Sequence, residues 1–133
     1  MALISITRLR VRFRRFLPQF LWYALRSARQ ARRAPGCFAA EIFRDADRAF
    51  WTATAWTDVA AMRAFMLSEP HRLAMPKLKE WCDEAFLVHW EQDTTELPSW
   101  REAHRQLTAE GRRSAVNHPS PRHLAMEIPE PRG

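Results

Sequence analysis

Residues 37–56, CFAAEIFRDADRAFWTATAW, predict a β-hairpin. In the first half, the side chains of Phe38, Ala40 and Ile42 alternate with those of the residues between them, which is the period of a strand. Residues 45–48 (DADR) are a short polar turn, and residues 49–56 are rich in β-formers. Two such strands joined by four residues are typical of an antiparallel pair.

A strand and a helix are predicted before this hairpin. Residues 2–11 are rich in aliphatic and β-branched side chains, which favours a strand. In residues 18–33, apolar side chains recur at helical spacing, and Arg26, Arg29 and Arg33 lie on another face. Pro18 suits the first turn of this helix, and Pro35 with Gly36 ends it.

After the hairpin, Thr57 or Asp58 is placed to cap a second helix with Met62 and Phe65 on its apolar stripe. Pro70 and Pro76 both suit first turns, so we expect a short turn at 70–74 and a helix near 76–84. Residues 85–92 read as the fourth strand. Asp83 and Glu84, just before it, are interpreted as surface residues.

The order β-α-β-β-α-β predicts an α+β, ferredoxin-like fold with an antiparallel four-stranded sheet. Ser99 and Glu102 match a capping box, so a further helix is expected at 100–110, with Gly111 as its stop signal. The resulting domain spans residues 1–111, with its core in 2–92. Residues 112–133 are rich in proline and are predicted to form an extended tail.

Composition excludes several classes of protein. The chain has 133 residues and only three glycines, which argues against a glycine-rich phosphate loop. The uncharged apolar run at 16–25 is too short to cross a bilayer, and the arginines around it argue against a secretory signal. Cys37 and Cys82 form no C-x-x-C pair, so we expect no zinc ribbon and a reducing, cytoplasmic location.

The net charge of +6 is unevenly distributed. Residues 1–36 contain nine arginines and no acid, whereas residues 37–111 carry a net charge of −5. The basic segment could bind nucleic acid or an anionic membrane. The simpler interpretation is a solvated basic face that contacts the acidic remainder of the chain.

Both faces of the predicted sheet carry bulky apolar groups. Phe50 and Trp56 point to one side of the third strand and Trp51 points to the other. Because the two helices of this fold cover only one face, the other face needs a second cover. A second copy of the sheet is the simplest one, which predicts a homodimer. The alternative is that the C-terminal helix folds over that face.

Short motifs then indicate a family. They are Ala53-Thr54-Ala55-Trp56 at a strand end, Asp58, Met62 and Phe65 in the next helix, and the step Ser68-Glu69-Pro70-His71. Residues 2–92 resemble the dimeric α/β-barrel superfamily that contains antibiotic biosynthesis monooxygenases. Pro70-His71-Arg72 also resembles spheroidene-monooxygenase-like members. The stretch as a whole is most similar to an uncharacterised bacterial branch.

The resemblance implies two sheets packed face to face as a dimeric barrel, with a pocket between sheet and helices in each subunit. It implies monooxygenase activity, either cofactor-independent or haem-dependent. His71 matches the histidine of the haem-degrading branch. Phe65 stands where that branch has a tryptophan, and Ser5 and Thr7 stand where it has an asparagine. These departures argue against haem degradation, whereas simple haem ligation by His71 stays open.

Five residues are candidates for the site. His71 could be a catalytic base or, if haem is bound, the axial ligand. Arg72 could hold a carboxylate, and Trp56, Phe65 and Trp90 could line an aromatic pocket. The structural alternatives are a capping histidine, a solvent-facing arginine and plain core aromatics. No metal site is expected.

Three functions are therefore considered. The first is a monooxygenase-like protein that acts on a small aromatic or quinol-like substrate. The second is a non-catalytic dimer that binds a small hydrophobic ligand or haem. The third is a basic interaction protein that binds nucleic acid or an anionic membrane through its arginine-rich N-terminal segment. No aromatic-interleaved nucleic-acid motif accompanies these arginines, so specific nucleic-acid binding is not expected.

Overall fold

The computed structural model describes residues 1–69 and 71–132. Pro70, which was expected in the first turn of a helix, lies outside the described residues. The elements in chain order are β1 (Ala2–Val11), α1 (Leu17–Arg33), β2 (Cys37–Arg44), β3 (Ala49–Trp56), α2 (Val59–Met66), α3 (His71–Trp81), β4 (Cys82–Gln92), α4 (Trp100–Glu110), β5 (Arg112–Arg113) and α5 (Pro121–Ala125).

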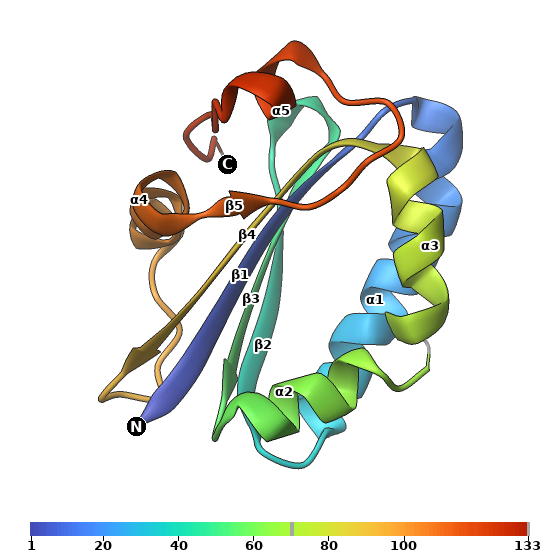
Figure 1. The fold of residues 1–133 in the computed structure, drawn as a ribbon. Helices are drawn as coiled ribbons and strands as arrows, with labels where there is room; N and C mark the ends of the chain where they lie inside the picture. Colours follow the sequence, from blue (N-terminus) through green and yellow to red (C-terminus); the bar gives the residue numbers. More distant parts are fainter. Residues whose placement is uncertain (70, 133) are drawn as a thin grey trace.

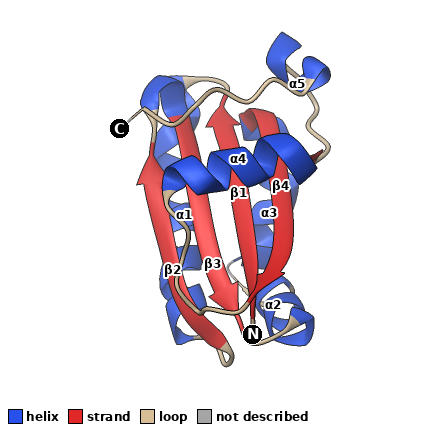
Figure 2. Cartoon of the chain, turned by 90° about the vertical axis from the view of Figure 1, so that its left-hand side faces the viewer, coloured by secondary structure: helices blue, strands red, loops and turns tan. Residues whose placement is uncertain are grey.

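The strands form one antiparallel sheet in the order β2-β3-β1-β4-β5 (Figures 1 and 2). β1 is the central strand and pairs with both β3 and β4, as the ferredoxin-like order requires. The predicted hairpin is present as β2 and β3. The prediction of four strands missed β5, a two-residue strand that extends the sheet beyond β4.

Helices α1, α2 and α3 cover one face of the sheet (Figure 1). Phe20 of α1 packs on Phe50 of β3, and Met62 and Phe65 of α2 pack with Leu3 of β1 and Trp56 of β3. α1 turns Phe20, Ala28 and Ala31 inward, and the two alanines belong to its predicted apolar stripe. Asp58 caps α2 by accepting a hydrogen bond from the Ala61 N–H, as predicted.

The other face of the sheet is covered by α4, which crosses the strands in Figure 2. Ala103 and Leu107 of α4 are fully buried in a cluster with Trp51 and Phe86 of the sheet. Ser99 caps α4 as predicted, through a hydrogen bond from the Glu102 N–H. The C-terminal helix thus provides the cover that the sequence analysis assigned to a second copy. This is the alternative named in the sequence analysis, and the homodimer stays a prediction.

Residues 112–132 do not form the extended tail that was predicted. They contain β5 and α5, and Met126 and Ile128 pack on the apolar cluster beneath α4. The backbone N–H of Arg132 donates to Oδ1 of Asp45 at 2.7 Å. Proline content alone predicted an extended segment, whereas the contacts that fold it come from the distant sheet.

The boundary between α3 and β4 also differs from the prediction. Pro76 lies inside a single helix that starts at His71, so the expected break at residues 74–76 is absent from α3. β4 starts at Cys82, three residues earlier than predicted. As a result Glu84 lies within the sheet and is buried, and its interpretation as a surface residue was wrong.

Candidate functional site

His71, the predicted catalytic residue, is the first residue of α3 and is half-buried. Its ring centroid lies 5.1 Å from that of Phe65. The ring of Phe65 in turn stacks on Trp56 at 5.3 Å. The structure therefore brings three predicted site residues together as a column of rings that runs from the end of β3 to the start of α3.

The hydrogen bonding of His71 defines its tautomer. Nδ1 lies 3.2 Å from the carbonyl oxygen of Met66. Because a carbonyl oxygen only accepts, Nδ1 must carry the proton in this bond, which leaves the lone pair on Nε2. Burial lowers the pKa of His71, while the bond to Met66 opposes this shift. A neutral imidazole with a basic Nε2 is the form that can accept a proton or bind a metal ion.

Trp56 and Phe65 are part of the core, and Phe65 also lines a groove on the outer surface. Trp56 is fully buried, and its indole N–H donates to Oγ1 of Thr54 at 2.8 Å. Phe65 is buried with it in a cluster that includes Leu3 and Met62. Phe65 contacts the ring of His71 and is itself supported by Trp56, so the two aromatic residues position the imidazole.

Trp90 and Arg72 are not brought to this column. Leu3 pairs with Trp56 and the next residue, Ile4, pairs with Trp90. Because successive residues point to opposite faces, Trp56 and Trp90 lie on opposite sides of the sheet and cannot line one pocket. The Arg72 side chain is exposed and pairs with Glu69 at 2.7 Å, as expected for a solvent-facing arginine.

A group of polar side chains on the helix-covered face was not recognised from the sequence. We call it the polar patch, and its members are Ser5, Thr7, Thr52, Thr54 and His89. Ser5 pairs with Thr54 on one side and with His89 on the other, so the three lie in one row across three strands. Thr7 and Thr52 form the next row along the sheet.

The polar patch lies at the centre of the sheet, beneath a helix layer. Nevertheless Ser5, Thr7, Thr52 and His89 remain partly exposed, and Thr54 is buried. Thr54 accepts the bond from Trp56; in residues 1–69 and 71–132 the other four side chains have no internal hydrogen-bond partner. Solvent therefore reaches the middle of this face.

His89 is the titratable member of the polar patch. Burial lowers its pKa, and the positive charge of Arg112 lowers it further. The described residues provide no hydrogen-bond partner for the His89 side chain. The signal that could have identified the patch is the run of hydroxyl residues at every second position, Ser5 and Thr7 in β1 and Thr52 and Thr54 in β3.

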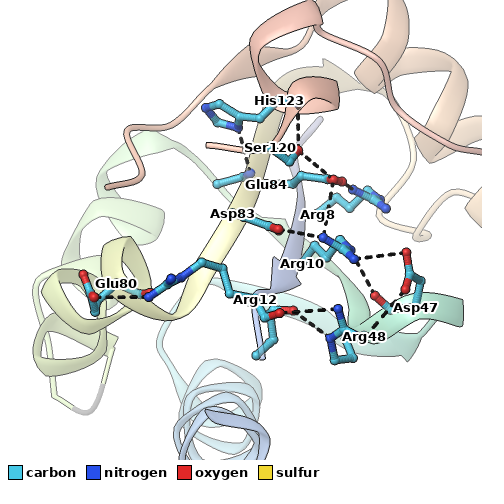
Figure 3. Close-up of polar contacts among 12 residues, drawn as sticks. Arg8, Arg10, Arg12, Asp47, Arg48, Glu80, Asp83, Glu84, Ser120 and His123 are labelled. Atoms are coloured by element: carbon cyan, nitrogen blue, oxygen red, sulfur yellow. Dashed lines mark hydrogen bonds and ion pairs between the residues drawn. The ribbon is translucent and has the colours of Figure 1, made fainter. Parts of the chain in front are cut away.

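A second polar cluster lies on the opposite face, beneath α5 (Figure 3). Arg8 pairs with Glu84 at 2.7 Å, and both side chains are buried. Ser120, the N-cap of α5, donates its hydroxyl to the other carboxylate oxygen of Glu84 at 2.9 Å. Arg10 binds Asp83 at 2.6 Å, and burial raises the pKa of Asp83 against the effect of Arg10. These contacts attach the tail to the sheet.

The outer surface carries a groove of about 550 Å³ between the end of α1 and α2. Ala60, Ala61 and Ala64 of α2 form much of its wall, and Arg33 and Asp58 contribute charges. His71 does not line this groove, and neither does any residue of the polar patch. Phe65 does line it, so the groove adjoins the column of rings.

The residues around His71 do not fit a haem. The ring of Phe65 occupies the space beside the imidazole, and Trp56 is packed directly behind Phe65. A macrocycle bound to Nε2 would also have no help from Arg72, which pairs with Glu69. No group of three or more potential metal-ligating side chains occurs among the described residues.

A family profile described as "Domain of unknown function (DUF3291)" matches residues 17–115. The chain belongs to this family. The matched range begins at α1 and extends through α4 to the residues just beyond β5, so the helix that covers the second sheet face is part of the DUF3291 domain. No curated protein matches the DUF3291 chain in sequence.

Solved structures share the fold of this DUF3291 chain. An antibiotic biosynthesis monooxygenase matches with a TM-score of 0.61 at 18% identity, over 69% of this chain and 99% of the other. SnoaB, a cofactor-independent oxygenase from Streptomyces nogalater, matches with a TM-score of 0.55 at 19% identity, over 71% and 95%. A conserved protein from Methanosarcina mazei Go1 has a TM-score of 0.62 at 14% identity, over 70% and 94%.

These matches confirm the predicted resemblance at the level of the fold. The DUF3291 chain has the ferredoxin-like α+β fold of antibiotic biosynthesis monooxygenases, with a five-stranded antiparallel sheet. Nearly the whole of each solved chain corresponds to about seven-tenths of this one, so the rest of this chain has no counterpart in them. Within the described residues, no helix is both long and apolar enough to span a bilayer.

Proposed function

We propose that this protein is an oxygenase that acts on a small aromatic or quinol-like substrate without a bound cofactor. The observation that carries the proposal is the polar patch, where hydroxyl groups and a histidine lie partly exposed at the centre of a sheet that helices cover. If this face served only as core, the centre of the sheet would carry fully buried apolar side chains. The fold, shared with a cofactor-independent oxygenase, supports the same conclusion.

Two histidines are available as the base. His71 has a hydrogen-bonded Nδ1 and a free lone pair on Nε2, which makes it our first choice. His89 lies in the polar patch, two residues along β4 from Glu91, in the row next to the one that holds Trp56. Burial keeps both imidazoles neutral near pH 7, so each can accept a proton.

The protein would contribute a base and an environment that excludes water. The imidazole removes a proton from an acidic carbon of the substrate, and the carbanion reduces dioxygen by one electron. The two radicals combine to form a C–O bond as a peroxide, which takes the proton back from the imidazolium. Cleavage of the O–O bond with loss of the second carbon-bound proton then gives the ketone and water. The hydroxyl groups of Ser5, Thr7 and Thr52 can donate hydrogen bonds to the negative charge that develops on the substrate oxygen. Trp56 and Phe65 act indirectly, by holding His71 in position.

Oxygen consumption tests this proposal. The purified protein is mixed with a panel of anthrones and naphthoquinols, and uptake is followed with an oxygen electrode. We expect turnover with at least one member and a fall in kcat of about 100-fold or more in His71→Ala or His89→Ala, because that is the usual contribution of a general base. His118→Ala is the matched control, since this histidine is half exposed and faces Glu80.

Failure to consume oxygen with any member of the panel would overturn the proposal. Binding is therefore measured separately, by quenching of tryptophan fluorescence. Tight binding without oxygen uptake would identify the alternative, a non-catalytic protein that carries a small hydrophobic ligand. If uptake occurs but both histidine variants retain it, the assignment of the base is wrong and the oxygenase proposal stands.

The assembly of the protein is also a proposal. A homodimer formed by packing two sheets face to face would require α4 to leave the sheet, because Ala103 and Leu107 occupy that surface. We therefore infer that the site is complete within one chain. Light scattering of the purified protein tests this, and a stable dimer that loses oxygenase activity on dilution would contradict it.

A further inference from the structure

The nine arginines of the N-terminal segment have different environments in the structure. Arg8, Arg10 and Arg12 point into the fold and pair with Glu84, Asp83 and Glu80 of the chain's acidic part. This confirms part of the expected contact between the basic segment and the acidic remainder. These three arginines are therefore not available to an external partner.

A second group of arginines is directed outward from α1. Arg26, Arg29 and Arg33 are exposed and have no ion pair within residues 1–69 and 71–132. They continue from Trp22 at intervals of four, three and four residues, so the four side chains lie along one line of the helix. α1 itself contains no acidic residue that would reduce this charge.

Two large apolar side chains lie within this line or beside it. Trp22 is 52% exposed and Leu25 is 61% exposed, although both belong to residue types that are usually buried. The Arg26 guanidinium lies 4.5 Å from the ring centroid of Trp22. We call Trp22, Leu25, Arg26, Arg29 and Arg33 the α1 patch.

From this pattern we infer that the α1 patch docks the protein on an anionic lipid bilayer, with α1 lying in the plane of the interface. Arginine supplies attraction to negative headgroups, and tryptophan and leucine enter the boundary between headgroups and acyl chains. The side chains of the α1 patch are exposed. α1 and α4 lie on opposite sides of the sheet (Figure 1). The molecule can thus bind through α1 without disturbing any contact described above.

The apolar side chains favour a bilayer over a nucleic acid. A phosphate backbone is bound by cations and hydrogen-bond donors, and an exposed leucine adds nothing to such a contact. An interfacial helix, in contrast, needs both a cationic and an apolar component. Each arginine near an anionic membrane is worth about a fivefold change in affinity, so the three together account for about 100-fold.

Co-sedimentation with vesicles tests the inference on the full-length protein. Vesicles of phosphatidylglycerol and phosphatidylcholine are compared with vesicles of phosphatidylcholine alone. We expect binding to the anionic vesicles, a loss of about 100-fold in Arg26→Gln/Arg29→Gln/Arg33→Gln, and a smaller loss in Trp22→Ala. All four side chains are exposed, so circular dichroism of the variants should match the wild type.

The matched control is Arg101→Gln/Arg112→Gln/Arg122→Gln, which removes the same charge from exposed positions on α4, β5 and α5. It should bind anionic vesicles like the wild type. Equal losses in the two triple variants would overturn the inference, because net charge alone would then explain binding. Binding to duplex DNA but not to vesicles, measured by anisotropy at the same ionic strength, would overturn it in favour of a nucleic acid, and absence of binding to either would also overturn it.

Discussion

Arg8 and Glu84 form an ion pair inside the protein, with Nη1 and Oε1 2.7 Å apart and each side chain only 2% exposed. The guanidinium also lies 6.0 Å from the ring centroid of Trp51. Ser120 binds the second carboxylate oxygen, so the pair joins β1, β4 and the tail. A buried pair of this kind is costly to break, because the remaining charge loses its partner without regaining water.

The first prediction concerns this pair. Replacing Glu84 with Gln should lower the free energy of unfolding by about 3–5 kcal/mol, because Arg8 would be left with an uncompensated buried charge. Urea unfolding followed by circular dichroism measures the change. The control is Glu69→Gln, which removes an exposed pair with Arg72 and should have little effect. Similar losses in the two variants would show that the burial of Glu84 is not what stabilises the fold.

The second prediction concerns α4. Leu107 is fully buried against the sheet, so Leu107→Asp should detach α4 and expose the apolar face beneath it. We expect the wild type to be a monomer and the variant to self-associate, as measured by size-exclusion chromatography with light scattering. Thr108→Asp, one residue further along and exposed, is the control. A variant that remains monomeric and as stable as the wild type would show that α4 does not seal this face.

The third prediction concerns pH. Burial lowers the pKa values of His71, His89 and His123 below the value of 6.5 that they have in an unfolded chain. The unfolded state therefore binds more protons below pH 6.5, and the free energy of unfolding should fall as the pH decreases from 7.5 through 6.5. The loss should level off once the folded-state pKa values have been passed. Urea titrations at several pH values between 8 and 5.5 measure it.

One of these histidines connects the pH effect to the tail. Nδ1 of His123 accepts a hydrogen bond from the Ala85 N–H at 3.3 Å, so protonation of this nitrogen would break the contact. His123→Gln should make stability less dependent on pH, whereas His118→Gln at an exposed position should not. A pH dependence that is unchanged in His123→Gln would exclude His123 as a contributor.

The fourth prediction concerns the column of rings. Phe65→Ala should cost about 3–5 kcal/mol, because it removes a buried ring that stacks on Trp56. It should also disturb His71 and therefore reduce any oxygenase activity. Val59→Ala, on an exposed position of the same helix, should cost much less. Calorimetry measures both variants, and an equal loss would show that the column carries no special stability.

Local patterns in the sequence were sufficient for β1, β2, β3, α1, α2 and α4, but not for β5 or the boundary between α3 and β4. The alternation in residues 37–56 predicted β2 and β3, and Asp58 and Ser99 marked the starts of α2 and α4. The tail could not be predicted in the same way. Its position depends on distant partners such as Glu84 and Asp45, which local composition does not reveal.

The candidate site was predicted only in part. His71, Phe65 and Trp56 come together because they are close in sequence and lie on the consecutive elements α3, α2 and β3. Trp90 was grouped with them as an aromatic strand residue, but the register of β1 places it on the other face. The polar patch is built from β1, β3 and β4, so recognising it requires that register as well as the sequence.

The position of α4 makes the burial of this sheet face independent of protein concentration. When a second subunit covers the apolar face of a sheet, that cover depends on the dimerisation equilibrium. At low protein concentration, part of the molecules are then monomers with this face exposed. Here Ala103 and Leu107 belong to the same chain as the sheet that they cover. The apolar face under α4 therefore stays covered at any protein concentration, even if a cell contains only a few copies of the protein.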